Sequence, residues 1–250
     1  MGRLGACAAG VLVLLGCGAD GDQQATVAGR EPDTRLQARV DGRGRACAPG
    51  EHELRVSRGR RALMRVTPTG SGRRRAVLLA LHGAGSGGAP GGLSVFRGAW
   101  DVPGLVIVAP AAAGSGWTLE ARDVEFVDRA LQQAFDRCVV NPRRVVVGGF
   151  SSGAGMALWL GLTNGDLFRT VISLSPGSSL PAQRVGKPWV FVAHGTEDSV
   201  IPIGLGGDRV AAELRRDGYR VTYRRFPGGH RVRPPIARAA VVRAVSERDS

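Results

Sequence analysis

Strand-like and helix-like patterns alternate along most of this chain, and that alternation restricts its fold more than any other feature of the sequence. Residues 76–81 form an unbroken apolar run that ends in His82-Gly83, which is typical of a strand buried in a parallel sheet. Residues 120–138 instead place apolar side chains along one stripe at helical spacing. The pattern predicts an α/β fold, with a mostly parallel sheet and helices on both faces.

The other expected elements continue this alternation to the end of the chain. Further strands are expected at residues 53–56, 61–67, 105–109, 144–148, 171–174, 189–193 and 221–226, and further helices at 153–162, 208–217 and 235–245. Ligands of such sheets bind at the carboxyl ends of the strands. Residues that directly follow a strand are therefore the first candidates for a functional site.

The first residues of the chain have the layout of an export signal. Arg3 precedes an apolar stretch, residues 4–15, that is shorter than the roughly 20 residues a membrane-spanning helix needs. The ending Leu14-Leu15-Gly16-Cys17 resembles a bacterial lipoprotein signal. We expect residues 1–16 to be a signal peptide and Cys17 to be lipidated. An ordinary secreted protein that is cut nearby is the alternative.

Residues 17–46 are polar and rich in glycine, so we expect a flexible tether there and a catalytic domain over residues 47–250. Two cysteines remain in that domain, Cys47 and Cys138. An even pair in an exported protein predicts one disulfide, and two buried free thiols are the alternative.

The formal net charge is +13, and 33 of the 34 basic residues are arginine. These arginines occur singly or in short groups between apolar runs, and aromatic residues make up only 5% of the chain. A nucleic-acid binder would gather its basic residues and add aromatic side chains for stacking, so we expect no nucleic-acid partner. A solvated basic surface is the simplest interpretation, and salt-sensitive attraction to anionic polymers or lipid headgroups is the alternative.

The most specific motif is Gly149-Phe150-Ser151-Ser152-Gly153, which follows one expected strand and precedes a helix. In that context G-x-S-x-G is a nucleophile elbow, a sharp turn that exposes the central serine at the end of its strand. The serine hydroxyl then lies near a helix N-terminus, whose N–H groups favour a developing negative charge. Ser151 is therefore the candidate nucleophile.

A serine hydroxyl needs a base, and in this arrangement the carboxylate and then the histidine follow the serine along the chain. His52 and His82 precede Ser151, and His194 closes a strand. His230 is therefore the candidate base. Asp198 follows the preceding strand and is the candidate carboxylate, with the adjacent Glu197 as a competitor.

The negative oxygen formed during acyl transfer needs hydrogen-bond donors. The backbone N–H of Ser152 is one candidate, and the loop after residues 76–81 offers Ala84 as the second. Trp117 follows the strand at 105–109 and either stacks on a ligand or belongs to the core.

Residues 83–88 also spell G-x-G-x-x-G after a strand, the fingerprint of a dinucleotide site. That fingerprint requires a helix to begin within the glycines. The following Ala89-Pro90-Gly91-Gly92 is not expected to continue a helix, so we expect no dinucleotide cofactor. No cluster of ligands shows metal spacing, so no metal is expected either.

The His82-Gly83-Ala84-Gly85 loop, the Gly149–Gly153 elbow, His194–Asp198 and Gly229-His230 resemble the α/β-hydrolase family. Within it they are similar to exported esterases such as polyhydroxybutyrate depolymerases and feruloyl esterases. After the serine this chain has Ser152 and Gly153-Ala154-Gly155, where those depolymerases often have Asn and Gly-Gly. Their substrate preference is therefore not carried over. The resemblance implies a serine esterase that forms an acyl-enzyme.

Only thirteen residues separate Leu174 from Pro188, too few for a helical lid. An open site favours short or polymer-attached esters over long lipids. Two other functions remain as alternatives: a serine peptidase on the same fold, and a surface lipoprotein that binds without catalysis. We expect contact with a membrane only through the lipid anchor.

Overall fold

The computed structural model describes residues 32–57, 59–70 and 73–246. The expected signal peptide, Cys17 and residues 18–31 of the expected tether lie outside these residues. The strands are β1 (Gly50–Ser57), β2 (Arg60–Val66), β3 (Arg75–Leu81), β4 (Leu105–Pro110), β5 (Val140–Phe150), β6 (Thr170–Leu174), β7 (Trp189–Gly195) and β8 (Val221–Phe226). The helices are α1 (Gly88–Val95), α2 (Ala121–Arg137), α3 (Ser152–Thr163), α4 (Gly207–Arg216) and α5 (Pro234–Ser246), with a short 3-10 turn at Arg97–Ala99.

The strands of the described residues form one eight-stranded sheet in the order β1-β2-β4-β3-β5-β6-β7-β8. β2 pairs antiparallel with both β1 and β4, and every other neighbouring pair is parallel. The parallel strands therefore all end at one edge of the sheet, here called the carboxyl edge, and all begin at the opposite one, the amino edge. The sheet confirms the predicted α/β architecture.

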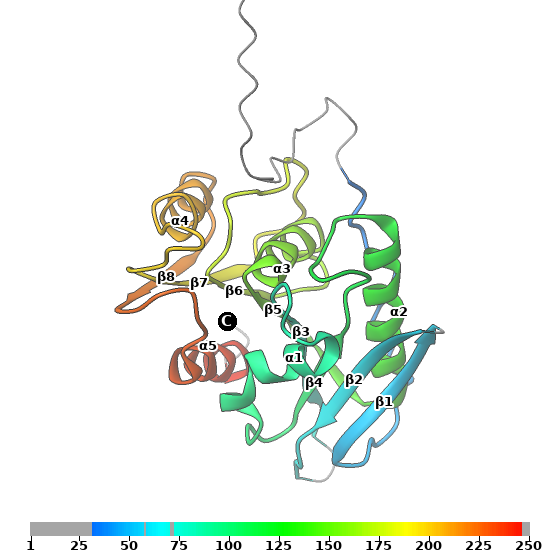
Figure 1. Ribbon diagram of the computed structural model, residues 1–250. Helices are drawn as coiled ribbons and strands as arrows, with labels where there is room; N and C mark the ends of the chain where they lie inside the picture. Colours follow the sequence, from blue (N-terminus) through cyan, green and yellow to red (C-terminus); the bar gives the residue numbers. More distant parts are fainter. Residues whose placement is uncertain (1–31, 58, 71–72, 247–250) are drawn as a thin grey trace, which may run out of the picture. The chain divides into compact units, whose positions relative to one another are not determined.

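Helices cover both faces of the sheet (Figure 1). Alternate residues of β3 show how the two cores form. Val77 and Leu79 belong to the core beneath α2, α3 and α4, whereas Leu78 and Ala80 belong to the core beneath α1 and α5. Since β3 is buried on both faces, its sequence is an unbroken apolar run.

The segment before β1 corrects the predicted domain boundary at Cys47. Leu36 and Ala38 are buried in the core that contains α2 and α3. The Leu36 N–H donates to Oδ1 of the buried Asn164 (2.9 Å), and the Ala38 N–H donates to Oδ1 of Asp128 (2.8 Å). Apolar side chains at alternate positions and these side-chain acceptors hold the segment in place. The described part of the expected tether is therefore part of the folded domain.

Helix α1 corrects a second prediction, that residues 89–92 would not form a helix. Pro90 lies in the first turn, where a backbone N–H has no helical acceptor and a proline is tolerated. A Cβ added at Gly92 would lie 2.7 Å from the carbonyl oxygen of Ala80, so the glycine lets α1 approach β3 closely. A helix therefore does begin within the glycines of residues 83–88, contrary to the expectation that was used to exclude a dinucleotide site.

A disulfide joins Cys47, in the segment before β1, to Cys138 at the end of α2. It is the pairing that the sequence predicts. Among the described residues, none of the helices has the length and apolarity to span a bilayer.

Candidate active site

Ser151 lies in a sharp turn between β5 and α3, at the carboxyl edge. Its φ is 54°, in the left-handed region that side chains rarely adopt, so the turn is strained at the serine itself. A Cβ added at Gly153 would lie 2.7 Å from the carbonyl carbon of Leu81. Glycine is therefore required where α3 passes the end of β3. The local structure is the nucleophile elbow that the motif predicts.

Asp198 and His230 meet at the same edge, after β7 and β8. The His230 ring nitrogen Nδ1 lies 2.7 Å from Oδ2 of Asp198. The other carboxylate oxygen, Oδ1, accepts the backbone N–H groups of Val200 (3.0 Å) and Ile201 (2.8 Å). The side chain of the competing Glu197 is exposed and makes no hydrogen bond within the described residues. Asp198 is thus the carboxylate that orients His230.

Burial by itself would raise the pKa of Asp198. The N–H of Ile201, the hydrogen bond and charge of His230, and the N–H of Val200 outweigh that effect and hold the pKa below its usual value. The carboxylate is therefore ionised at neutral pH. An ionised partner at Nδ1 leaves the other nitrogen of the His230 ring, Nε2, to act as the base.

Phe150, the residue before the serine, links the two parts of the site. Its ring centroid lies 4.7 Å from that of His230. A Cβ added at Gly83 would contact both the Phe150 ring and Cβ of Ser151. The elbow, the base and the loop after β3 therefore gather around Phe150.

The candidate oxyanion donors flank a single glycine. A Cβ added at Gly116 would lie 3.1 Å from Cβ of Ala84 and 3.2 Å from Oγ of Ser152. The backbone N–H groups of Ala84 and Ser152 donate to no acceptor within the described residues. Both donors are therefore available to a ligand at the serine. The Ser152 hydroxyl is also buried without a partner there.

Two buried histidines support the site without being candidates for the base. The first, His82, follows β3. Its Nε2 accepts the N–H of Ala112 (3.0 Å), so Nδ1 carries the proton and donates to the Gly83 carbonyl (2.8 Å). Burial lowers the pKa of His82, which keeps the ring neutral. It thereby holds the loop that carries Ala84 against the loop after β4.

The second buried histidine, His194, contacts the Asp198 carboxylate. Nδ1 of His194 accepts the N–H of Gly207 (3.0 Å), so the ring proton is on Nε2. That nitrogen lies 2.9 Å from the carbonyl oxygen of Ile201 and 3.1 Å from Oδ2 of Asp198. His194 therefore donates to the Ile201 carbonyl and lies beside the carboxylate oxygen that binds His230.

Trp117 is half-buried beside the loop after β3. Its indole N–H donates to the His82 carbonyl (3.0 Å), and its ring lies 5.1 Å from the His82 ring. These contacts explain its orientation without a ligand. A role in binding substrate stays a prediction.

Asp123, on the first turn of α2, is fully buried and anchors the loop after β4. Its Oδ1 accepts the Ala113 N–H and an Arg60 guanidinium, and its Oδ2 accepts the N–H and hydroxyl of Thr118. This loop carries Gly116 and Trp117. The supporting roles of Asp123, His82 and His194 were not predicted, because their partners are mostly loop backbone groups that only the fold brings to them.

Among the described residues no group of three or more histidine, cysteine or carboxylate side chains could hold a metal ion. The groups gathered at the carboxyl edge can perform acyl transfer: a strained serine, an imidazole held by a carboxylate, and two open N–H donors.

Comparison with known proteins supports the same class. Residues 120–235 match a family model described as phospholipase/carboxylesterase. The chain is 32% identical to acyl-protein thioesterase 1 of Gibberella zeae over 121 residues, which are 44% of this chain and 50% of that protein. It is 37% identical to the Neurospora crassa protein of the same name over 97 residues, 35% of this chain and 39% of that protein. The matched region spans about half the length of the Gibberella relative.

Solved structures show the same fold. Esterase PE8 is 24% identical with a TM-score of 0.59, covering 73% of this chain and 97% of that one. The Staphylococcus aureus serine hydrolase FphF is 13% identical with a TM-score of 0.64, covering 80% and 100%. The finer resemblance to depolymerases and feruloyl esterases is not among these findings and stays a prediction. The sheet, the elbow and these matches together show that the chain has the α/β-hydrolase fold.

Proposed function

We propose that this protein is a serine hydrolase of carboxylic esters that acts through an acyl-enzyme. The observation that carries the proposal is the 2.7 Å contact between Nδ1 of His230 and Oδ2 of Asp198 at the same edge as the strained Ser151. An imidazole that a carboxylate orients is what a serine hydroxyl needs in order to attack.

In the proposed reaction the Ser151 oxygen attacks the ester carbonyl carbon while Nε2 of His230 takes the hydroxyl proton. Asp198 stabilises the imidazolium, and the N–H groups of Ala84 and Ser152 hold the negative oxygen. When the carbonyl re-forms, the alcohol leaves with the proton from His230. Water then attacks the acyl-serine with the same base, which releases the acid and restores Ser151.

The substrate class follows from the site and from the relatives. The connection between β6 and β7 contains no helix, so no helical lid covers the serine from that loop. We propose short or polymer-attached esters as substrates. The relatives named acyl-protein thioesterase favour a second candidate, an acyl thioester, because the same attack cleaves either bond.

Substitution of the serine tests the enzymatic proposal. Ser151→Ala should abolish hydrolysis of p-nitrophenyl acetate and labelling by a fluorophosphonate. Ser94→Ala, which changes an exposed serine on α1, is the matched control and should retain both. Full turnover by Ser151→Ala would overturn the assignment, and a folded wild-type protein that is neither labelled nor active would favour the non-catalytic binding role.

A substrate panel separates the remaining possibilities. It contains acetyl, butyryl, feruloyl and octanoyl esters, an acyl thioester and a peptide amide. We expect the highest kcat/KM for a short ester or the thioester. Preferential cleavage of the peptide would instead support the peptidase alternative.

We also propose that the protein is exported and anchored through Cys17, on the strength of the signal in residues 1–17. Expression of the full chain with labelled palmitate should place the label on the wild type and not on Cys17→Ala. Processing of both variants without label would support an ordinary secreted protein.

A further inference from the structure

A cavity of about 510 Å³ lies at the amino edge of the sheet, opposite the candidate active site. Four of its lining residues are arginines, Arg73, Arg74, Arg144 and Arg238, and no lining residue is a carboxylate. Arg238 pairs with Asp101 outside the cavity. The other three arginines form no ion pair within the described residues. The cavity therefore concentrates uncompensated positive charge.

Two further cavities continue this basic region. One of about 320 Å³ shares Thr69 and Arg73 with the first, adds Arg45 and Arg75, and again has no carboxylate in its lining. Arg75 itself donates to the Thr67 and Cys47 carbonyls and serves the fold.

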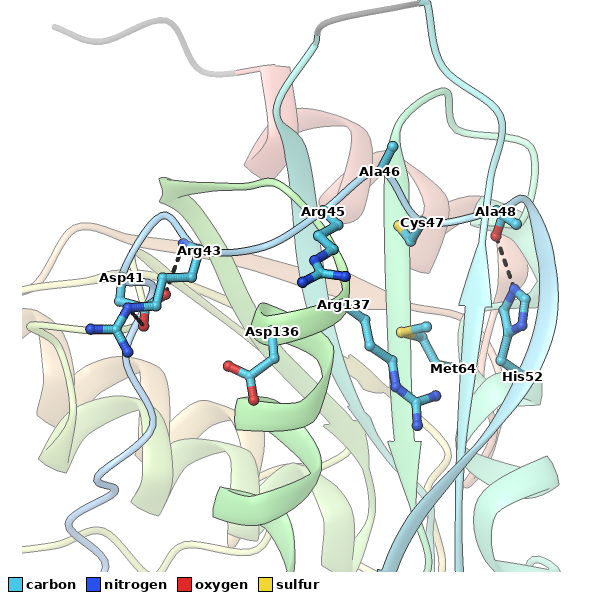
Figure 2. Close-up of a pocket in the computed structure, with 10 residues that line it drawn as sticks. All are labelled: Asp41, Arg43, Arg45, Ala46, Cys47, Ala48, His52, Met64, Asp136 and Arg137. Carbon is cyan, nitrogen blue, oxygen red and sulfur yellow. Dashed lines mark hydrogen bonds and ion pairs between the residues drawn. The ribbon is translucent and has the colours of Figure 1, made fainter.

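The third cavity, of about 730 Å³, shares Arg45 with the second and is shown in Figure 2. There Asp41 and Asp136 accompany the arginines, and Asp41 pairs with Arg43. Positive charge is thus least compensated around Arg73, Arg74 and Arg144. We call these three residues together with Arg45 the basic edge.

Strand direction explains why the cations collect here. Arg74 directly precedes β3, Arg144 lies in the first half of β5, Arg169 directly precedes β6, and Arg220 directly precedes β8. Parallel strands all begin at one edge of a sheet, so cations near their starts lie along that edge. The candidate catalytic residues follow the strands and lie at the opposite edge.

The lining of the first cavity also suits a lipid surface. Its apolar members are Ala76, Val102, Pro103, Val242 and Val245; Ala76 and Val102 are buried, whereas Val242 is 37% exposed. No lining residue of the first two cavities is aromatic, so the platform on which single-stranded nucleic acids stack is absent from them. Arginines around an apolar patch match phosphate headgroups above acyl chains.

The described chain also enters the domain at this edge. Thr34 bonds to Thr163, the last residue of α3, through their hydroxyl groups (2.8 Å). Since α3 begins at the carboxyl edge, directly after β5, and β6 begins at Thr170, the end of α3 lies toward the amino edge. The first described residues therefore lie on the side of the domain that carries the basic edge.

We propose that the basic edge docks on anionic phospholipid headgroups and turns the carboxyl edge, with Ser151, away from the bilayer. The phosphates pair with Arg73, Arg74, Arg144 and Arg45, and Val242 and Val245 contact the boundary of the acyl chains. This proposal concerns a surface remote from the candidate active site and does not depend on the esterase proposal.

Vesicle binding by the full chain tests it, with Cys17→Ala in every sample so that no lipid anchor contributes. Vesicles of phosphatidylcholine with 30% phosphatidylglycerol are compared with vesicles of phosphatidylcholine alone, at low and high salt. The variant Arg73→Gln/Arg74→Gln/Arg144→Gln is compared with Arg55→Gln/Arg122→Gln/Arg129→Gln, which removes the same charge from exposed positions on β1 and α2.

We expect the starting protein to bind only the anionic vesicles, and binding to fall at high salt. Each arginine near such a surface contributes roughly a factor of five, so the basic-edge variant should bind about a hundredfold more weakly. The control variant should stay within about threefold. Inorganic phosphate should not compete at millimolar concentration, because a single anion engages too few arginines.

Equal losses in the two triple variants would overturn the proposal in favour of net charge alone. So would tight binding to single-stranded DNA without binding to vesicles, or competition by free phosphate. Hydrogen exchange of the starting protein with vesicles is a readout that needs no basic-edge variant. Protection should appear in residues 73–76 and 140–146, and its absence there would also overturn the proposal.

Discussion

The charged side chains at the two edges of the sheet differ in burial and in the partners that they have. At the carboxyl edge, Asp198 is buried, and hydrogen bonds from two backbone N–H groups and His230 fix its position, with the His194 ring beside it. At the amino edge, Arg73 and Arg74 are exposed and form no ion pair within the described residues. A buried charge with fixed partners can orient one proton transfer. Exposed positive charges attract any anionic surface, and salt weakens that attraction.

The largest effect should come from removing the buried charge. Asp198→Asn keeps the size of the side chain but favours the wrong tautomer of His230, and we expect kcat to fall by about ten-thousandfold. Glu197→Gln changes the exposed neighbouring carboxylate and should leave kcat within a few fold. Steady-state kinetics on p-nitrophenyl acetate measures both, and similar losses in the two variants would show that Asp198 is not the special carboxylate.

Loss of Asp123 should affect stability more than any change at the basic edge. Asp123→Asn leaves the partly buried Arg60 without its charge partner, and we expect the free energy of unfolding to drop by about 3 kcal/mol. Asp136→Asn, on the exposed face of the same helix, should cost less than about 0.5 kcal/mol. Urea unfolding gives both values. A small loss in Asp123→Asn would mean that the loop after β4 is held by other contacts.

His194 should act on catalysis through Asp198. His194→Leu removes the hydrogen bond to the Ile201 carbonyl, and the N–H of Ile201 holds Asp198, so we expect kcat to fall about tenfold with KM nearly unchanged. His194→Gln keeps an N–H donor and should restore most of that loss. If both variants lose stability and kcat to the same extent, His194 serves only the core.

The free energy of unfolding should depend on pH through the ionisation of Asp198. Its pKa is depressed in the folded protein, so its ionised form stabilises the fold above the unfolded pKa of about 3.9. This contribution is lost as the pH falls through the lower folded pKa. The difference in unfolding free energy between wild type and Asp198→Asn should therefore shrink below about pH 4. A difference that stays constant from pH 7 to pH 3 would contradict the depressed pKa.

The smallest effect on stability and on activity in solution is expected from changes at the basic edge. Arg73→Gln/Arg74→Gln/Arg144→Gln should change the free energy of unfolding by less than about 0.5 kcal/mol per site and leave esterase kcat unchanged, because these side chains touch no catalytic group. A large loss of activity in solution would show that the two edges are coupled.

Most of the fold was predictable because parallel strands and amphipathic helices have distinct apolar patterns. The exceptions have physical causes. Helix α1 contains a proline and adjacent glycines, which sequence preference disfavours, but the proline lies in the first turn and Gly92 permits a close approach to β3. Residues 34–40 do alternate polar and apolar side chains. Their backbone N–H groups bond to side chains of α2 and to Asn164 rather than to a neighbouring strand, so they do not form a strand of the sheet.

The candidate site was likewise predicted only in part. Ser151, Asp198 and His230 follow from motif order and strand ends, and the structure brings Asp198 and His230 within hydrogen-bond distance. What His82 and His194 hold depends on how backbone groups of other loops approach them. No spacing along the chain contains that information.

The anchoring of residues 34–40 has a practical consequence for any shortened chain. A protein trimmed at Cys47, the boundary that composition suggests, would lose Leu36 and Ala38 from its interior and leave Asn164 with two broken hydrogen bonds. Such a fragment would expose apolar surface beside α2 and α3 and should aggregate. The shortest chain that folds on its own should therefore start no later than about residue 32, where the disulfide is a second attachment of this segment rather than its only one.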